Sequence, residues 1–113
     1  QAVDKIQVVK DSIVIGQPWE NDERIILFVT LTDGNSFSKE LIKYIQEIIK
    51  ENCTNRHVPS KVIQVQEIPY TINGKKVELA VKQVIQNKEV KNIASISNPE
   101  ALNYYKNLSA LKF

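Results

Sequence analysis

Residues 68–77 predict a sharp turn of the chain, and their sequence is Ile68-Pro69-Tyr70-Thr71-Ile72-Asn73-Gly74-Lys75-Lys76-Val77. A strand pattern ends at the proline, and Asn73-Gly74 is a strong hairpin signal because both residues tolerate positive φ. Such a turn places Lys75 on a tight loop, and binding side chains concentrate on loops of this kind. A lysine there suits a phosphate or a carboxylate. An ordinary hairpin with solvated lysines fits the same residues.

Regular elements are predicted on both sides of this turn. Residues 61–67 predict a strand, bounded by Pro59 and Pro69. Residues 76–86 predict a helix, because apolar residues recur there at helical spacing: Val77, Leu79, Ala80, Val84 and Ile85. Lys76 would open this helix, so we expect its side chain to point to solvent or along the helix.

The C-terminal part predicts less regular structure. Residues 87–97 lack periodicity and predict a surface loop. Asn98 is placed as the N-cap before a proline at the first position of a short last helix, residues 99–107. We expect Tyr104 and Tyr105 on this helix to pack against the rest of the domain.

Two further strands precede the turn. Residues 12–17 form a short apolar run that ends in glycine and predict a strand, and residues 17–23 are polar and predict a loop that contains Trp19. We expect Trp19 to pack over the sheet edge, with a contact surface as the alternative. Residues 24–31 are nearly continuously apolar, which predicts a strand buried on both faces.

A long amphipathic helix follows the second strand. Ser38 is a plausible N-cap, and the helix should end near Asn52. One apolar stripe runs along it: Leu41, Ile42, Ile45, Ile48 and Ile49. Taken together, the pattern predicts an α/β (α+β) fold. Its small mixed sheet has about three strands and a short hairpin, and about three helices pack against it.

Composition narrows the functional class. The chain has 113 residues, one domain's length, with 25% charged residues and a net charge of +2. No basic stripe argues for nucleic acid, and no apolar run approaches the ~18 residues of a membrane span. The single cysteine fits a reducing compartment, and no signal-peptide pattern is present. We therefore expect a cytoplasmic protein without nucleic-acid or membrane partners.

Residues 56–63 and 68–78 together resemble the C-terminal domain of adenylate-forming acyl-CoA synthetases. That family carries a Pro-x-Thr-x-Ser-Gly-Lys loop, and this chain has its matching residues at Pro69, Thr71, Gly74 and Lys75. Asn73 stands where Ser is usual. Glu78 stands where many members carry Arg, and both departures argue against an acetate-activating enzyme.

With these departures, the chain resembles the branch of the family that activates acetoacetate. The run Pro69-Tyr70-Thr71-Ile72-Asn73-Gly74-Lys75-Lys76-Val77-Glu78 resembles that branch, and so do the tail residues 97–102 and 105–108. The resemblance extends over nearly the whole chain and is loose before residue 56. It implies that residues 1–113 form the C-terminal lid domain of an AMP-forming acyl-CoA synthetase, without the N-terminal nucleotide-binding domain and hinge.

The resemblance also implies roles for individual residues. Lys75 would be the catalytic lysine of the adenylation step, and Thr71, Asn73 and Gly74 would contact substrate. Arg56 could reach a phosphate of coenzyme A or of the nucleotide, although a surface ion pair fits it equally. ATP and CoA would be substrates, with Mg²⁺ accompanying ATP in the full-length enzyme. This chain alone would bind none of them and would be inactive, and its partner would be the N-terminal domain.

Other readings of the sequence remain open. A stand-alone interaction module could use the lysine loop to bind an acidic partner, and another carboxylate-adenylating enzyme could carry the same lid. Cys53 and His57 supply only two potential metal ligands, fewer than a metal site needs. We therefore expect no metal site and an inert, partly buried thiol.

Overall fold

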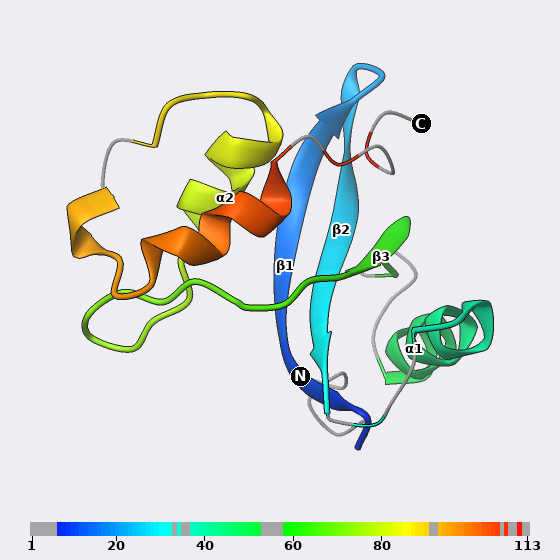
Figure 1. Ribbon diagram of the computed structural model, residues 1–113. Coiled ribbons are helices and arrows are strands. Elements are labelled where there is room, and N and C mark those ends of the chain that lie inside the picture. The colour runs from blue at the N-terminus through cyan, green and yellow to red at the C-terminus, as the bar shows by residue number, and fades with distance from the viewer. Residues whose placement is uncertain are drawn as a thin grey trace.

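The computed structural model describes residues 7–32, 34, 37–52, 58–90, 93–106, 108 and 111, and it has a mixed α/β architecture (Figure 1). Strands β1 (Val9–Trp19) and β2 (Asp22–Leu31) pair antiparallel, and β3 (Lys61–Gln64) pairs parallel to β2, giving the sheet order β1-β2-β3. The predicted three-stranded mixed sheet is therefore confirmed. Within these residues no helix is long and apolar enough to cross a bilayer.

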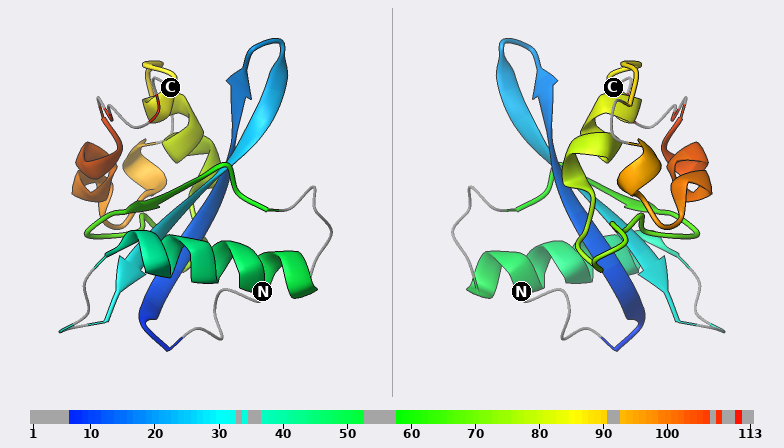
Figure 2. Two further views of the ribbon diagram at one scale, coloured as in Figure 1. Left: turned by 90° about the vertical axis from the view of Figure 1, so that its right-hand side faces the viewer. Right: turned by 90° about the vertical axis from the view of Figure 1, so that its left-hand side faces the viewer.

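Helices cover both faces of this sheet (Figure 2). Helix α1 (Lys39–Asn52) lies on one face, and α2 (Glu78–Ile85) lies on the other together with a 3₁₀ helix, Pro99–Tyr105. Strand β2 separates two apolar clusters. Ile26 and Phe28 pack toward α2, whereas Leu27 and Val29 pack toward α1, and all four are fully buried. Successive side chains on a strand alternate between faces, so both faces of this continuous apolar run are buried, as predicted.

The predicted loop at residues 17–23 is wrong. The two strands continue to Trp19 and Asp22, and they are joined by a tight turn at Glu20 and Asn21 with φ of 49° and 64°. Two consecutive positive φ angles match the right-handed twist of the strands. The sequence concealed this turn because it lacks glycine, and because Pro18 suggested a loop. Proline is tolerated there since β1 is an edge strand.

Helix α1 forms as predicted. The amide of Leu41 donates to Oγ of Ser38 at 3.1 Å, which is the expected N-cap, and the helix ends at Asn52. Ile45 and Ile49 are buried in the cluster beneath it. The helix also supplies the crossover that a parallel β2–β3 pair requires.

Three boundaries differ in the second half. Strand β3 ends at Gln64 rather than residue 67, although the Val65 amide still donates to the Val29 carbonyl at 2.9 Å. Helix α2 begins at Glu78, two residues later than predicted. Residues 87–97 contain a 3₁₀ turn, Ile93–Ser95, and the last predicted helix is 3₁₀ over Pro99–Tyr105.

The last helix also differs in its side chains. Tyr105 is fully buried, as predicted, but Tyr104 is 44% exposed, so its predicted packing is wrong. Asn98 occupies the predicted N-cap position before Pro99, but its side chain makes no cap hydrogen bond to this helix.

Candidate functional site

The Asn73-Gly74 turn forms the predicted short hairpin. Tyr70 and Lys76 pair antiparallel at its base, and Gly74 has φ +82°. The Thr71 amide donates to the Lys75 carbonyl at 2.7 Å, and the Gly74 amide donates to the Thr71 carbonyl at 2.8 Å. These contacts close the loop so that Lys75 leaves the turn at a defined position.

Thr71 shapes this loop from inside. It is half-buried, and its Oγ1 accepts a hydrogen bond from the Lys75 amide at 3.1 Å. Thr71 also pairs with Ile96, and the neighbouring Ile72 amide donates to the Ser95 carbonyl at 3.0 Å. The residue predicted to contact substrate therefore fixes the backbone of the lysine loop.

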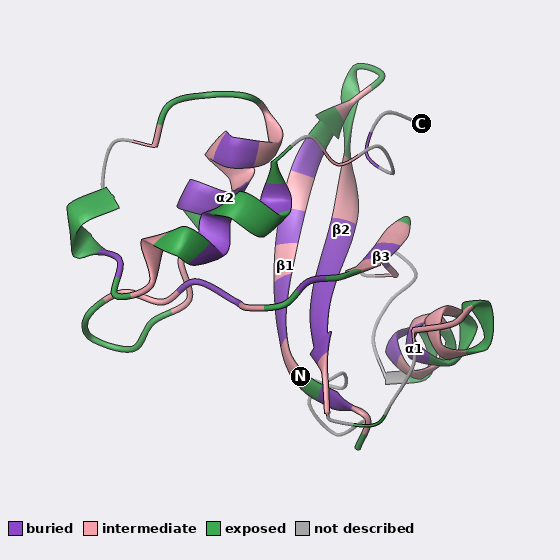
Figure 3. Ribbon diagram, viewed as in Figure 1, coloured by how far each residue is buried: buried purple, intermediate pink, exposed green. Residues whose placement is uncertain are grey.

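The tip of the hairpin faces solvent (Figure 3). Asn73, Gly74 and Lys75 are exposed next to one another, as a loop that meets a ligand requires. A large apolar side chain precedes them in the chain, since Ile72 is 73% exposed. The tip thus offers one ammonium group beside apolar surface, which can approach an anionic group that a partner surface has partly removed from water.

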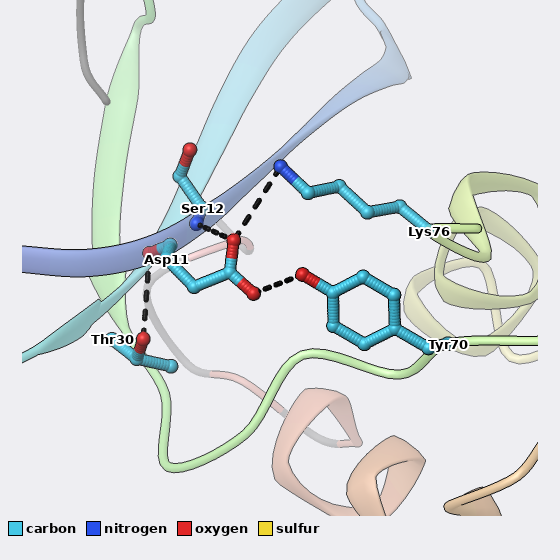
Figure 4. Close-up of polar contacts among 5 residues, drawn as sticks. All are labelled: Asp11, Ser12, Thr30, Tyr70 and Lys76. Carbon is cyan, nitrogen blue, oxygen red and sulfur yellow. Dashed lines mark hydrogen bonds and ion pairs between the residues drawn. The ribbon is translucent and has the colours of Figure 1, made fainter. Parts of the chain in front are cut away.

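Lys76 does not point to solvent or along the helix, and this expectation is corrected. Its Nζ lies 3.5 Å from Oδ1 of Asp11 on β1, and the two side chains are 33% and 26% exposed. The Tyr70 hydroxyl donates to the other oxygen of the same carboxylate, as Figure 4 shows. Adjacent lysines of the hairpin therefore have different surroundings, because Lys76 belongs to its base and Lys75 to its tip.

Asn98 also holds the first arm of the hairpin. Its Oδ1 accepts from the Tyr70 amide at 2.9 Å, and its Nδ2 donates to Glu67 Oε2 at 2.9 Å and to the Ile68 carbonyl at 3.0 Å. A polar hollow of about 320 Å³ lies here, lined by Asp11, Glu67 and Tyr70 among others. Analysis of the sequence missed the structural role of Asn98 and of Asp11. The sequence marked Asn98 as an N-cap and as part of the tail that resembles the family, and it gave no signal for Asp11.

Tyr105 links this region to the sheet. Its hydroxyl donates to the Glu67 carbonyl at 2.9 Å, and its ring meets Phe28 edge-on, with centroids 4.8 Å apart. Burial raises the pKa of Tyr105 above its ordinary value, and the nearby Asp11 and Glu67 carboxylates raise it further. The tyrosine is therefore neutral and acts as a donor under physiological conditions.

Trp19 is half-buried at the far end of the β1–β2 hairpin. The guanidinium of Arg24 lies 3.7 Å from its ring centroid, and Arg24 Nε donates to Gln17 at 2.7 Å. A second nitrogen of Arg24 donates to the Leu111 carbonyl at 2.8 Å. Desolvation lowers the pKa of Arg24, and Glu20 opposes that shift.

Arg56, Cys53 and His57 lie outside the described residues, so their predicted roles stay predictions. Among the residues that are described, no group of three or more His, Cys, Asp or Glu side chains could hold a metal ion. The predicted site residues that can be placed, Thr71, Asn73, Gly74 and Lys75, all lie in one hairpin.

Comparison with known proteins gives this hairpin a context. Residues 1–75 match the AMP-binding enzyme C-terminal domain. Acetoacetyl-CoA synthetase of Gallus gallus is 43% identical over 111 residues, which cover 97% of this chain and 17% of that protein. The Xenopus tropicalis acetoacetyl-CoA synthetase is 47% identical over 105 residues, 92% of this chain and 16% of that protein.

A solved structure agrees in fold. Acetoacetyl-CoA synthetase from Streptomyces lividans superposes with a TM-score of 0.85 at 33% identity, covering 99% of this chain and 17% of that one. The chain thus spans about a sixth of the length of the relatives it matches. The family match extends over more than half of the chain and ends at the lysine of the hairpin, so this chain belongs to the AMP-binding enzyme C-terminal domain family.

Proposed function

We propose that this chain is the C-terminal lid of an acetoacetate–CoA ligase, which converts ATP, acetoacetate and CoA into AMP, pyrophosphate and acetoacetyl-CoA. The relatives that cover 92–97% of the chain carry the name acetoacetyl-CoA synthetase. The observation that carries the proposal is the exposed Lys75 at the tip of a braced hairpin in a domain of this family.

The chemistry requires a cation at such a place. A carboxylate is a poor electrophile, so it first attacks the α-phosphate of ATP and forms an acyl-adenylate with release of pyrophosphate. The thiol of CoA then displaces AMP. Two anions approach each other in the first step, and a positioned ammonium group between them offsets the repulsion and stabilises charge on the phosphoryl oxygens.

The hairpin residues divide this work. Lys75 provides the charge, and Thr71 holds its backbone through the hydrogen bond at 3.1 Å. Gly74 supplies the positive φ that the turn needs, and Asn73 brings a side-chain amide to the same exposed tip. Asn73 can donate to a phosphate or carboxylate oxygen, so we assign it to substrate together with Lys75.

The remaining parts of the reaction belong to the rest of the full-length protein. The N-terminal domain of the same polypeptide would bind ATP with its Mg²⁺, and this domain would close over it in the cytoplasm. Arg56 would contact a phosphate of CoA or of the nucleotide. We therefore expect the 113-residue chain alone to show only background ATP–pyrophosphate exchange with acetoacetate.

The test separates the two half-reactions in the full-length protein. Lys75→Ala should lower adenylate formation by about 10²–10³-fold, because one preorganised charge contact is lost. Thioester formation from supplied acetoacetyl-adenylate should be nearly unchanged, since the lysine acts before the adenylate exists. Both rates can be measured by pyrophosphate exchange and by release of AMP.

Lys88→Ala is the matched control, because Lys88 is an exposed lysine outside the hairpin. It should leave both half-reactions unchanged. Equal damage to both half-reactions by Lys75→Ala would refute the assignment of Lys75 to adenylation. A wild-type enzyme that exchanges pyrophosphate with other acids but not with acetoacetate would instead refute only the substrate.

A further inference from the structure

We propose that Asp11, Tyr70 and Lys76 form a clamp that positions the Lys75 loop against strand β1, and that adenylation depends on this clamp more strongly than thioester formation does. The inference rests on the proposed adenylation role of Lys75. It adds three positioning residues that act through the backbone of the hairpin rather than by touching substrate.

The clamp begins at Asp11 of β1, next to an irregularity in the strand. The β1–β2 register shifts between Val9 and Asp11, which inserts one extra residue into the edge strand. Without this bulge, Val9 and Asp11 would lie on the same face of the sheet. With it, Val9 joins the cluster under α1, whereas Asp11 keeps the alternation of Ile13 and Ile15 and its carboxylate lies on the opposite face, toward the hairpin.

The carboxylate of Asp11 then joins both arms of the hairpin. Tyr70 on the first arm donates its hydroxyl to one oxygen, and Lys76 on the second arm places Nζ 3.5 Å from the other (Figure 4). The Ser12 amide donates to Oδ1 of Asp11 at 2.8 Å, which fixes the carboxylate itself. Tyr70 and Lys76 are the pair that closes the base of the hairpin, so one carboxylate holds both ends of the loop.

The clamp matters because the hairpin has little backbone pairing of its own. Its arms meet at the Tyr70–Lys76 bridge, with flanking hydrogen bonds from Thr71 to Lys75 and from Val77 to Pro69. Lys76 is covalently next to Lys75, so a shift of the base moves the Lys75 backbone directly. Misplacement of a reacting group by about 1 Å can cost on the order of 10²-fold in rate.

A surface ion pair of no consequence is the competing explanation, because partly exposed pairs contribute little to stability. The chain offers a matched control. Lys82 of α2 lies 3.7 Å from Glu23 of β2, with side chains 37% and 55% exposed, and neither residue belongs to the hairpin. Lys82→Met removes a comparable ion pair without touching the lysine loop.

The experiment measures both half-reactions in the full-length protein for Asp11→Asn, Lys76→Met, Tyr70→Phe and Lys82→Met. The three clamp variants should each lose roughly tenfold in adenylate formation, a smaller loss than Lys75→Ala causes. Their thioester formation from supplied adenylate should stay within about twofold. Lys76→Arg keeps the charge and should retain most of the rate, whereas Lys82→Met should resemble the wild type. The Asp11→Asn/Lys76→Met double variant should be little worse than either single one, because both remove the same contact.

Amide hydrogen exchange provides a readout that does not depend on the reaction. Exchange at residues 70–77 should accelerate in Asp11→Asn and Lys76→Met, and it should not change in Lys82→Met. The clamp is refuted if the clamp variants leave both amide exchange and adenylation unchanged. It is also refuted if a folded clamp variant loses both half-reactions equally. If Asp11→Asn does not fold, Lys76→Met and Lys76→Arg decide the question. Lys75→Ala with normal adenylation would instead refute the proposed function while the exchange result still judges the clamp.

Discussion

The molecule contains two hairpins that are held in different ways. The β1–β2 hairpin pairs along its whole length up to the Glu20–Asn21 turn. Its second strand lies between the two apolar clusters and contributes side chains to both. The hairpin of residues 70–76 has one bridge pair at its base and an exposed tip. Side chains from distant parts of the chain, Asp11 and Asn98, hold its arms in place.

The two hairpins therefore differ in role: the long one is part of the scaffold, and the short one carries the candidate site. A long ladder with a buried strand resists displacement, since many hydrogen bonds and apolar contacts would have to break together. A short hairpin held by side chains can be positioned precisely and also released locally, because few contacts fix it. The candidate lysine lies on the second kind. Substitutions in each hairpin can test whether the first one determines the stability of the fold and the second one determines only the position of Lys75.

The largest effect on stability should come from the core of the long hairpin. Phe28 is fully buried, so Phe28→Ala should lower the free energy of unfolding by about 3–5 kcal/mol. Ile72 on the short hairpin is 73% exposed, so Ile72→Ala should change it by less than about 0.5 kcal/mol. Urea unfolding of the 113-residue chain measures both. Equal costs would show that the two hairpins share one core after all.

The two turns should respond in opposite directions to substitution. Gly74 has φ +82° and an added Cβ would meet nothing within 4 Å, so Gly74→Ala should cost about 1–2 kcal/mol through the backbone alone. Asn21 has φ 64°, so Asn21→Gly relieves a strained conformation and should be neutral or slightly stabilising. Thermal unfolding of the two variants compares them. A neutral Gly74→Ala would mean that the short hairpin can adopt another turn without loss.

Tyr105 joins the two regions, and its substitution should have a modest effect on stability with a distinct pH dependence. Tyr105→Phe removes the hydrogen bond to Glu67 but keeps the ring on Phe28, so it should cost about 1 kcal/mol at neutral pH. The folded pKa of Tyr105 lies above its unfolded value, so the stability it confers is complete below about pH 10 and is lost as the pH rises further.

Urea midpoints measured across that alkaline range should therefore fall less steeply in Tyr105→Phe than in the wild type. Lys88→Ala supplies a control whose alkaline slope should match the wild type. Parallel slopes for Tyr105→Phe and the wild type would show that Tyr105 can ionise without unfolding the domain.

The elements with local physical causes were predictable from sequence alone. The apolar run of β2 required burial on both faces, Ser38 supplied a cap whose partner lies three residues away, and Asn73-Gly74 defined a turn by its tolerance of positive φ. The resemblance at residues 56–78 gave the family, and the comparison confirmed it. In each case the interacting groups are neighbours in the chain, or the pattern itself carries the information.

The tertiary structure decided how the candidate lysine loop is held. Tyr70 and Asp11 are 59 residues apart, and they meet because Asp11, like Ile13 and Ile15, lies on the face of β1 against which the hairpin packs. The position of Lys76 beside the same carboxylate, and not on the solvent-facing side of a helix, likewise follows from the folded sheet. Side-chain periodicity predicts which residues are buried, but it does not specify the register between distant strands. A shift of one residue exchanges the faces of a strand, so only the folded sheet determined which charged groups meet.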